Sequence, residues 1–395
     1  MKKIIILILV CTVGILAAQT FTLEKAIEIS LKNNYDLLSS YNISKISNIN
    51  KFQAYRNMLP QPSVFAGYSD SEPGMKNENY GLSVTQPLFQ GGQLFFSAKN
   101  ASLQEKIAKL ETKQQILQTI TTVENYYYEV LQAAESKKIA KQNLEQAENQ
   151  LKIGQAKYEL NTLPENELLL LQSEKSEKQL AFIRARNSYE ISKEQLSNYL
   201  NTDIQGNLEE IEPSPSLLKL INNSEQNFVD KLQNKLIEFA EKNNPALQVA
   251  ELNVNISKKN KWSNLGQYLP DISLNYNNNW SKSKIENDYS NSESVQINAS
   301  LPLSFSNTTA DVIKSKYELR NSYYSLESNL QTVHLAVKSS FLNVIASVQA
   351  IQASQEYLDY AKNLYAKSET RFQERIISTS ELLDANLALE NAKLA

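Results

Sequence analysis

The stretch "KYELNTLPENELLLLQ", Lys157–Gln172, follows a long helical pattern, and "RFQERIISTSELLDAN", Arg371–Asn386, repeats its layout near the end of the chain. Each copy has a basic and an aromatic residue, then a few turn-forming residues, then an acidic residue followed by leucines. The two copies are 214 positions apart, Arg371 against Lys157. Because helical patterns lie on both sides, each stretch predicts a tight reversal between two long helices.

A nearly constant offset recurs along the chain and indicates an internal duplication. Asn33 aligns with Asn243 at an offset of 210, and Leu88 aligns with Leu303 at 215. Matches that keep their order over such a distance are the signature of a repeated structural unit. The predicted organisation is a first repeat over residues 19–200, a linker over 201–229 and a second repeat over 230–395.

Long helices dominate the predicted fold, because the 395 residues include only 9 Gly and 10 Pro. Apolar residues spaced by three, four or seven predict helices over 91–160 and 307–374, each about 100 Å long at 1.5 Å per residue. The first of these turns back over residues 165–200. A helix of about 35 residues opens each repeat, over 22–58 and 230–268, and ends where a Leu-Pro pair stops it.

Four segments alternate apolar and polar residues and predict strands over about 62–70, 80–89, 271–280 and 293–303. The polar positions are small and uncharged. The apolar positions expected to face lipid are Val64, Tyr68, Leu82, Val84, Ile272, Leu274, Tyr276, Val295, Ile297 and Leu301. We expect Trp280, which ends a strand, to mark a membrane interface. Taken alone, the strands fit a half-buried soluble sheet equally well.

A membrane interpretation of these strands requires several chains. No stretch after the first 20 residues approaches 18 apolar residues, so a spanning helix is not expected, and strands cross a bilayer only in a closed barrel. Four strands per chain fall short of the roughly eight of the smallest known barrels. Three chains would supply twelve.

The N-terminal "MKKIIILILVCTVGILAAQT" predicts a secretory signal peptide over residues 1–18, so the mature chain is expected to be exported. Cys11, the single cysteine, lies within it, which excludes thiol chemistry in the mature chain. A lipoprotein signal has a small residue before its cysteine, and Val10 is a poor match.

Composition and motifs argue against an enzyme or a nucleic-acid-binding protein. The net charge is −3, and no cluster of Lys and Arg is interleaved with aromatic residues. His334, the sole histidine, falls within a long helix and has no nearby cysteine, so we expect a structural or exposed role. No phosphate-binding glycine loop is present. We expect no catalytic, cofactor or metal site.

Four segments together resemble the TolC-type outer-membrane efflux protein family: "FTLEKAIEISLKNNYDL", "QYLPDISLNY", "VTQPLFQGGQLFFSAKN" and "RFQERIISTSELLDANLALENAKL". The resemblance extends over nearly the whole mature chain, duplication included. It implies a mainly α fold with a membrane β-barrel portion: a homotrimeric twelve-stranded barrel among outer-membrane lipid that continues into a periplasmic α-helical tunnel. It also implies a passive exit duct, opened by a periplasmic adaptor (membrane fusion) protein and an inner-membrane pump, in tripartite efflux or type I secretion.

The same resemblance assigns roles to residues at the helix turns. The adaptor-docking tips are Leu160, Asn161 and Thr162 in the first repeat and Glu374, Arg375 and Ile376 in the second. The family builds these turns on a glycine; Asn tolerates a left-handed conformation better than Arg, so we expect the second turn to differ in shape. Glu381 and Asp384, three apart on one helix face, fall on the family's acidic constriction, and Glu167 takes the matching place in the first repeat.

Plainer interpretations remain open at this stage. The tips can be merely exposed turns and the carboxylates a solvated helix face. A secreted coiled-coil adhesin or scaffold without channel activity is the alternative function, and the cargo of a duct can be drugs, metal ions or a secreted protein. The second returning helix stops at Ala395, without a counterpart of residues 182–200, so we expect a truncated chain.

Overall fold

The structure is a computed structural model, which describes residues 21–70, 76–204, 206, 208–211, 226–283, 289–301, 303, 305–374 and 376–395. The predicted signal peptide with Cys11, residues 212–225 of the predicted linker, and Arg375 lie outside the described residues.

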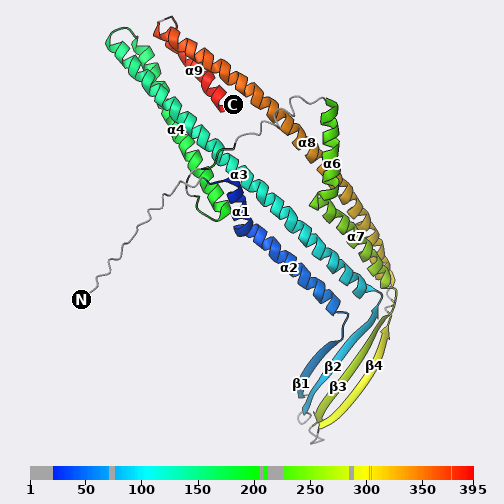
Figure 1. The fold of residues 1–395 in the computed structure, drawn as a ribbon. Helices are drawn as coiled ribbons and strands as arrows, with labels where there is room; N and C mark the ends of the chain where they lie inside the picture. Colours follow the sequence, from blue (N-terminus) through cyan, green and yellow to red (C-terminus); the bar gives the residue numbers. More distant parts are fainter. Residues whose placement is uncertain are drawn as a thin grey trace, which may run out of the picture. The chain divides into compact units, whose positions relative to one another are not determined.

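The described chain is mainly helical and runs twice through the order helix, helix, strand, strand, helix, helix (Figure 1). The first run comprises α1 (Leu23–Asn33), α2 (Tyr35–Arg56), β1 (Gln61–Asp70), β2 (Lys76–Gln90), α3 (Gln93–Glu159) and α4 (Glu165–Leu200). The second comprises α6 (Gln226–Asn243), α7 (Pro245–Gly266), β3 (Asp271–Ser283), β4 (Tyr289–Ser300), α8 (Phe305–Gln373) and α9 (Thr379–Leu394).

The helix that opens each repeat is broken, which corrects the single helix expected from the sequence. Asn34 separates α1 from α2 with an extended ψ of 123°, and its N–H donates to the Ser30 carbonyl at 2.9 Å. Asn244 separates α6 from α7 with ψ 120°, and its side chain accepts from the Ala246 and Leu247 N–H groups. The following Pro245 disfavours a helical conformation at Asn244, and the Asn side chain supplies the N-cap of α7.

The four strands form one antiparallel sheet in the order β1-β2-β3-β4. In the register of β1 with β2, Gln61 pairs with Thr85. Asn77 of β2 pairs with Ser283 of β3, and Asp271 of β3 pairs with Ser300 of β4. A bulge shifts the register of β2 between Pro87 and Phe89. β4 ends at Ser300, one residue before Leu301, which was expected within the strand. Strands β1 and β4 each have one edge without a partner strand in the described chain.

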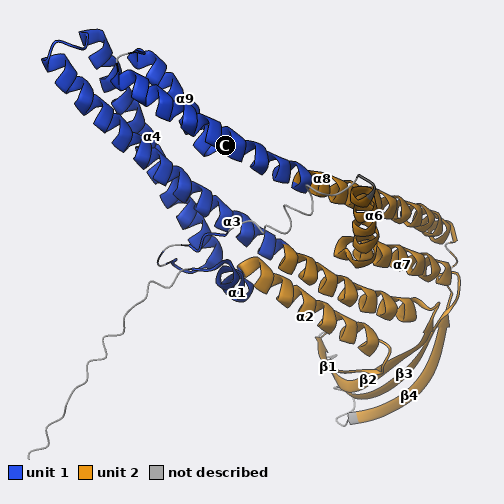
Figure 2. Ribbon diagram, turned by 45° about the horizontal axis from the view of Figure 1, so that its top comes forward, with its two compact units in different colours: residues 1–34, 118–224, 344–395 blue, residues 35–117, 225–343 orange. Residues whose placement is uncertain are grey.

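The chain divides into two compact units that do not coincide with the two sequence repeats (Figure 2). Unit 1 comprises residues 1–34, 118–224 and 344–395, and unit 2 comprises residues 35–117 and 225–343. Each unit takes segments from both repeats, because α3 and α8 are long enough to contribute to both units.

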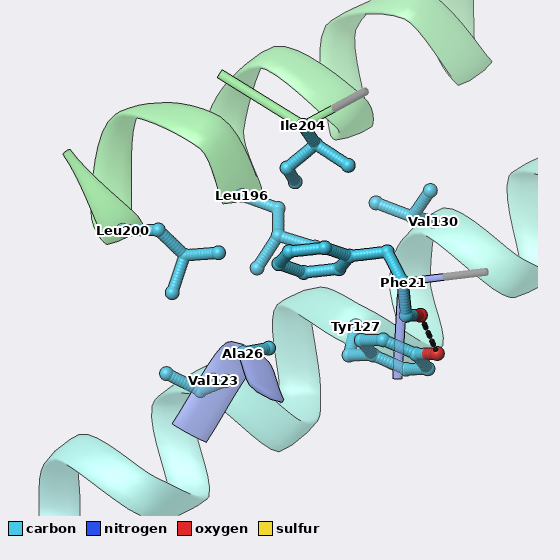
Figure 3. Packing of buried hydrophobic residues seen from close by; sticks show 8 residues of the cluster. All are labelled: Phe21, Ala26, Val123, Tyr127, Val130, Leu196, Leu200 and Ile204. Carbon is cyan, nitrogen blue, oxygen red and sulfur yellow. Dashed lines mark hydrogen bonds between the residues drawn. The ribbon is translucent and has the colours of Figure 1, made fainter. Parts of the chain in front are cut away.

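The core of unit 1 packs α1, α3 and α4 around the first described residue (Figure 3). Its buried members are Phe21, Ala26, Val123, Tyr127, Val130, Leu196, Leu200 and Ile204. The Tyr127 hydroxyl donates to the Phe21 carbonyl at 2.7 Å and accepts from the Glu209 N–H at 3.0 Å. Phe21 also forms a parallel bridge with Leu208, so this cluster fastens two irregular segments to α3.

Unit 2 holds the sheet and the helices that adjoin it. Between α2 and α3, the buried Glu105 carboxylate pairs with Lys51 and Lys109. At the junction of β2 and α3, Gly91 has φ +55° and its backbone touches that of Gly266, so neither position has room for a Cβ. Among the described residues of the whole chain, no helix is both long and apolar enough to cross a membrane.

Candidate functional site

The turn between α3 and α4 is a tight reversal centred on Asn161. Asn161 is left-handed, with φ 54°, and the Thr162 N–H donates back to the Lys157 carbonyl at 2.9 Å. The Asn161 N–H donates to the Tyr158 carbonyl at 2.8 Å. These two bonds define a Schellman cap, which satisfies the last carbonyls of α3 and places the left-handed residue just after the helix. Leu160, at the tip, is 73% exposed.

The turn between α8 and α9 is closed by the equivalent backbone hydrogen bond, which spans five residues. The Ile376 N–H donates to the Arg371 carbonyl at 2.8 Å, at the same offset of 214 as Thr162 and Lys157 in the first turn. Glu374 and Ile376 are exposed at this tip. Arg375 lies outside the described residues, so the expected difference in its backbone shape stays a prediction.

The predicted acidic residues lie at the start of α9. The Ser378 hydroxyl caps this helix by accepting from the Glu381 N–H at 3.3 Å. Glu381 and Asp384 are both exposed on the same side of α9, and the described residues place no cation in an ion pair with either. Glu167 of α4 reaches this turn, because its carboxylate accepts from the buried Thr379 hydroxyl at 2.6 Å.

A buried polar cluster below this turn was not predicted from the sequence. Lys178 of α4, only 5% exposed, donates to Glu390 of α9 at 2.5 Å and lies 3.3 Å from Glu174. Asn143 of α3 donates to the other Glu390 oxygen at 2.9 Å. Burial would lower the pKa of Lys178, but its hydrogen bond to Glu390 and the two carboxylate charges outweigh burial and raise that pKa. The cluster joins α3, α4 and α9.

Further polar contacts continue along the same helices of unit 1. Gln146 of α3 donates to the buried Asn386 of α9 at 3.0 Å, and Gln150 donates to the Tyr365 hydroxyl of α8 at 3.4 Å. The Lys157 ammonium lies 4.4 Å from the centre of the Phe372 ring. Side-chain amides and charges therefore contribute contacts between the two helical hairpins in this region.

The sheet register gathers the predicted lipid-facing residues. Directly paired residues of adjacent strands point to the same face, and the pairs include Val64 with Leu82 and Val84 with Tyr276. By this register nine of the ten predicted residues share one face, and the tenth, Leu301, lies just after the end of β4. Val64 is 83% exposed, so nothing in the described chain covers this face of β1.

On β2 and β3 the apolar band of this face ends in an aromatic pair, and on β1 it continues to Tyr68, opposite Glu78. The rings of Tyr80 and Trp280 stack with centroids 5.6 Å apart and an interplanar angle of 12°. The next pair of opposite residues, Glu78 and Lys282, is charged. From Ile272 to Trp280 the band is about 27 Å long at 3.3–3.4 Å per residue.

The described residues offer no metal-binding cluster. No group of three or more His, Cys, Asp or Glu residues that could hold a metal ion occurs among them. His334 of α8 contacts Glu241 of α6 at 2.5 Å and is about one-third exposed, so the sole histidine takes part in a contact between helices.

Comparisons with known proteins agree with this architecture. A model of the outer membrane efflux protein family matches residues 36–202 and 236–395. The fold is similar to CusC, whose solved structures concern transmembrane channel formation: the TM-score is 0.78 at 15% identity, over 94% of this chain and 87% of that one.

Two further structures show the same fold. The CmeC outer membrane channel of Campylobacter jejuni matches with a TM-score of 0.76 and 16% identity, over 94% of this chain and 81% of that one. The outer membrane protein VceC of Vibrio cholerae matches with a TM-score of 0.76 and 12% identity, over 94% of this chain and 90% of that one. The comparison with curated proteins gives no match. The family match covers most of the sequence, and the chain therefore belongs to the outer membrane efflux proteins, the TolC-type family, with its place in the outer membrane.

Proposed function

We propose that three copies of this chain form a passive exit duct from the periplasm to the exterior. The observation that carries the proposal is the sheet. It has two open edges, one mainly apolar face and one polar face, and the apolar side chains of its outer strands, such as Val64 and Ile297, are exposed in the single chain. Exposed edges of this kind need partners in a membrane, because backbone groups cannot stay unpaired in hydrocarbon.

Closure of the sheet by copies of itself satisfies both edges. β1 of one chain pairs with β4 of the next, and three four-stranded sheets give a barrel of twelve strands, within the range of known outer-membrane barrels. The apolar band of about 27 Å along a strand, once tilted by 35–45°, spans about 19–22 Å along the barrel axis, a few ångströms less than the roughly 25 Å band of such barrels. The Tyr80–Trp280 pair then lies at the membrane interface, where aromatic girdles occur.

The helices supply the periplasmic tunnel in this proposal. The hairpins α3/α4 and α8/α9 line it, and Glu381 and Asp384 form stacked rings of carboxylates in the trimer at its constriction. Such rings attract cations and impede anions. Support comes from the exposure of both carboxylates on one side of α9 and from the Glu167–Thr379 bond, which fixes the start of that helix.

The two turns dock a periplasmic adaptor, which connects the duct to an inner-membrane pump. Leu160 and Ile376 are exposed apolar residues at the tips, and a backbone hydrogen bond closes each turn, from Thr162 to Lys157 and from Ile376 to Arg371. The duct itself catalyses no reaction, and its adaptor decides whether the cargo is a small molecule, a metal ion or a secreted protein.

Extraction and conductance measurements test this function. The purified chain should require detergent, run as a trimer that heat dissociates, and conduct ions in a planar bilayer. Leu160→Glu should reduce adaptor co-purification without changing conductance, with the exposed mid-helix Leu180→Glu as its control. A monomer soluble in buffer without conductance would instead favour a secreted scaffold.

A further inference from the structure

The polar face of the sheet carries almost no ionisable side chain. Paired rows across it read Ser83, Asn277 and Ser294, and then Thr85, Asn275 and Gln296. Among the strand residues whose side chains are described, the one ionisable residue on this face is Asp271, the first residue of β3.

The other charged strand residues whose side chains are described lie on the opposite face. By the register, Asp70, Glu78, Lys282 and Glu293 all share the face of the apolar band. The Glu293 carboxylate there accepts from the Tyr276 hydroxyl at 2.8 Å. Apart from Asp271, the described side chains of the polar face therefore carry no fixed charge, although charged residues occur in the same strands.

Amides and hydroxyls on the polar face are ordered by one another. The Ser83 hydroxyl donates to the Asn277 side chain at 2.7 Å, and the Thr85 hydroxyl donates to that of Asn275 at 2.9 Å. Each bond joins β2 to β3. Cross-strand bonds of this kind hold neutral groups in place while leaving their remaining donors and acceptors open to water.

One aromatic ring interrupts this surface. Phe65 lies opposite Gly81, and a Cβ at Gly81 would collide with the Phe65 ring and with the Asn278 carbonyl. The ring covers the strand at a residue that has no side chain, an arrangement that stabilises glycine within sheets. Phe65 adds no charge, so the neutral character of the face is unbroken there.

We propose that this face lines the barrel lumen as a neutral hydrogen-bonding wall, so that beyond Asp271 the barrel passes anionic, cationic and uncharged polar cargo alike. The inference rests on the proposed trimeric duct. A lumen lined with one sign of charge concentrates the opposite ion, by tenfold or more in narrow passages. A wall of amides and hydroxyls lacks this effect, so charge selection in the duct falls to the carboxylates outside the strands and to Asp271.

The accessibility of introduced cysteines tests both which face of the sheet lines the lumen and whether that face is neutral. Cys11 is the only native cysteine, and it lies within the predicted signal peptide, so single cysteines are unambiguous after cleavage. Asn277→Cys and Asn278→Cys place thiols on opposite faces at adjacent positions. Membrane-inserted trimers are treated with a cationic and an anionic methanethiosulfonate, and each rate is divided by that of a free thiol.

At Asn277→Cys both reagents should react and reduce conductance, with normalised rates within about twofold of each other, because no fixed charge biases them. Asn278→Cys should stay unreactive, since its thiol faces lipid. Asn275→Asp in the Asn277→Cys background tests sensitivity: a carboxylate on the same face should shift the rate ratio severalfold toward the cation.

A tenfold bias at Asn277→Cys would overturn the neutral wall while leaving the barrel intact. Reaction at Asn278→Cys without reaction at Asn277→Cys would show that the opposite face of the sheet lines the lumen, which would also overturn the inference. Failure of the proposed duct has its own signature, namely loss of trimer and conductance in the unmodified protein.

Discussion

Replacing Lys178 with methionine should loosen α9, and the magnitude follows from the burial of the pair it forms. Its side chain is 6% exposed and that of Glu390 is 15% exposed, with 2.5 Å between ammonium and carboxylate. Removing one partner of a buried pair costs about 3–5 kcal/mol, because the other charge is left without compensation. Glu390 keeps the hydrogen bond from Asn143 and some solvent access, so we expect about 3 kcal/mol, near the lower limit.

Hydrogen exchange of the α9 amides is the appropriate assay, because it reports local opening rather than global unfolding. A loss of about 3 kcal/mol corresponds to roughly hundredfold faster exchange in peptides covering Thr379–Leu394. Lys178→Met with Glu390→Met should restore most of the protection, since replacing both partners by apolar groups is close to neutral. Lys32→Met, which removes an exposed pair with Glu28, is the matched control and should leave exchange unchanged.

The pH dependence of this pair has a defined sign. Because the pKa of Lys178 is raised in the folded state, its contribution is complete below the ordinary lysine pKa of about 10.4 and is lost as the pH rises through the folded value. Unchanged exchange in Lys178→Met, or a double variant as labile as the single one, would refute the argument.

Three further outcomes follow from local geometry. The hydrogen bond from Lys109 lowers the pKa of the Glu105 carboxyl, and burial opposes this effect. The stability that this carboxylate contributes above about pH 4.3 should therefore be lost as the pH falls through its pKa in the folded protein. Glu105→Gln should reduce this loss of stability in acid, measured by a denaturation series over pH. Asn161→Ala should cost about 1 kcal/mol of thermal stability at the left-handed turn while Asn161→Gly costs nothing; equal melting temperatures would contradict this. Gly266→Ala should lower the yield of folded protein, because its Cβ would meet the Gly91 carbonyl, and a normal yield would contradict the close approach.

The elements that the sequence predicted well are those with local signals. Alternation over eight or nine residues is read from the strand itself, so β1 to β4 lie within a few residues of the expected ranges. The turn at Asn161 likewise depends on residues within one reversal. Apolar spacing continues across Asn34 and predicts one unbroken helix, and only the backbone shows the break.

The polar cluster could not have been predicted in the same way. Lys178 lies within "SEKSEKQ", which has the composition of a solvated helix face, and its partner Glu390 is 212 positions away. Its burial depends on how α9 packs against α3 and α4, which no local pattern encodes. The sheet faces are an intermediate case. The alternation of side chains between two faces can be read from each strand alone, but only the pairing of the strands shows that their four polar faces coincide.

Trimerisation with conductance is the central claim, and one measurement addresses it most directly. The signal-processed chain, purified in detergent, is sized by mass photometry and added to a planar bilayer in the same preparation. We expect a species of three chains that dissociates on heating and yields single-channel steps. A monomer that needs no detergent and leaves the bilayer silent would contradict it.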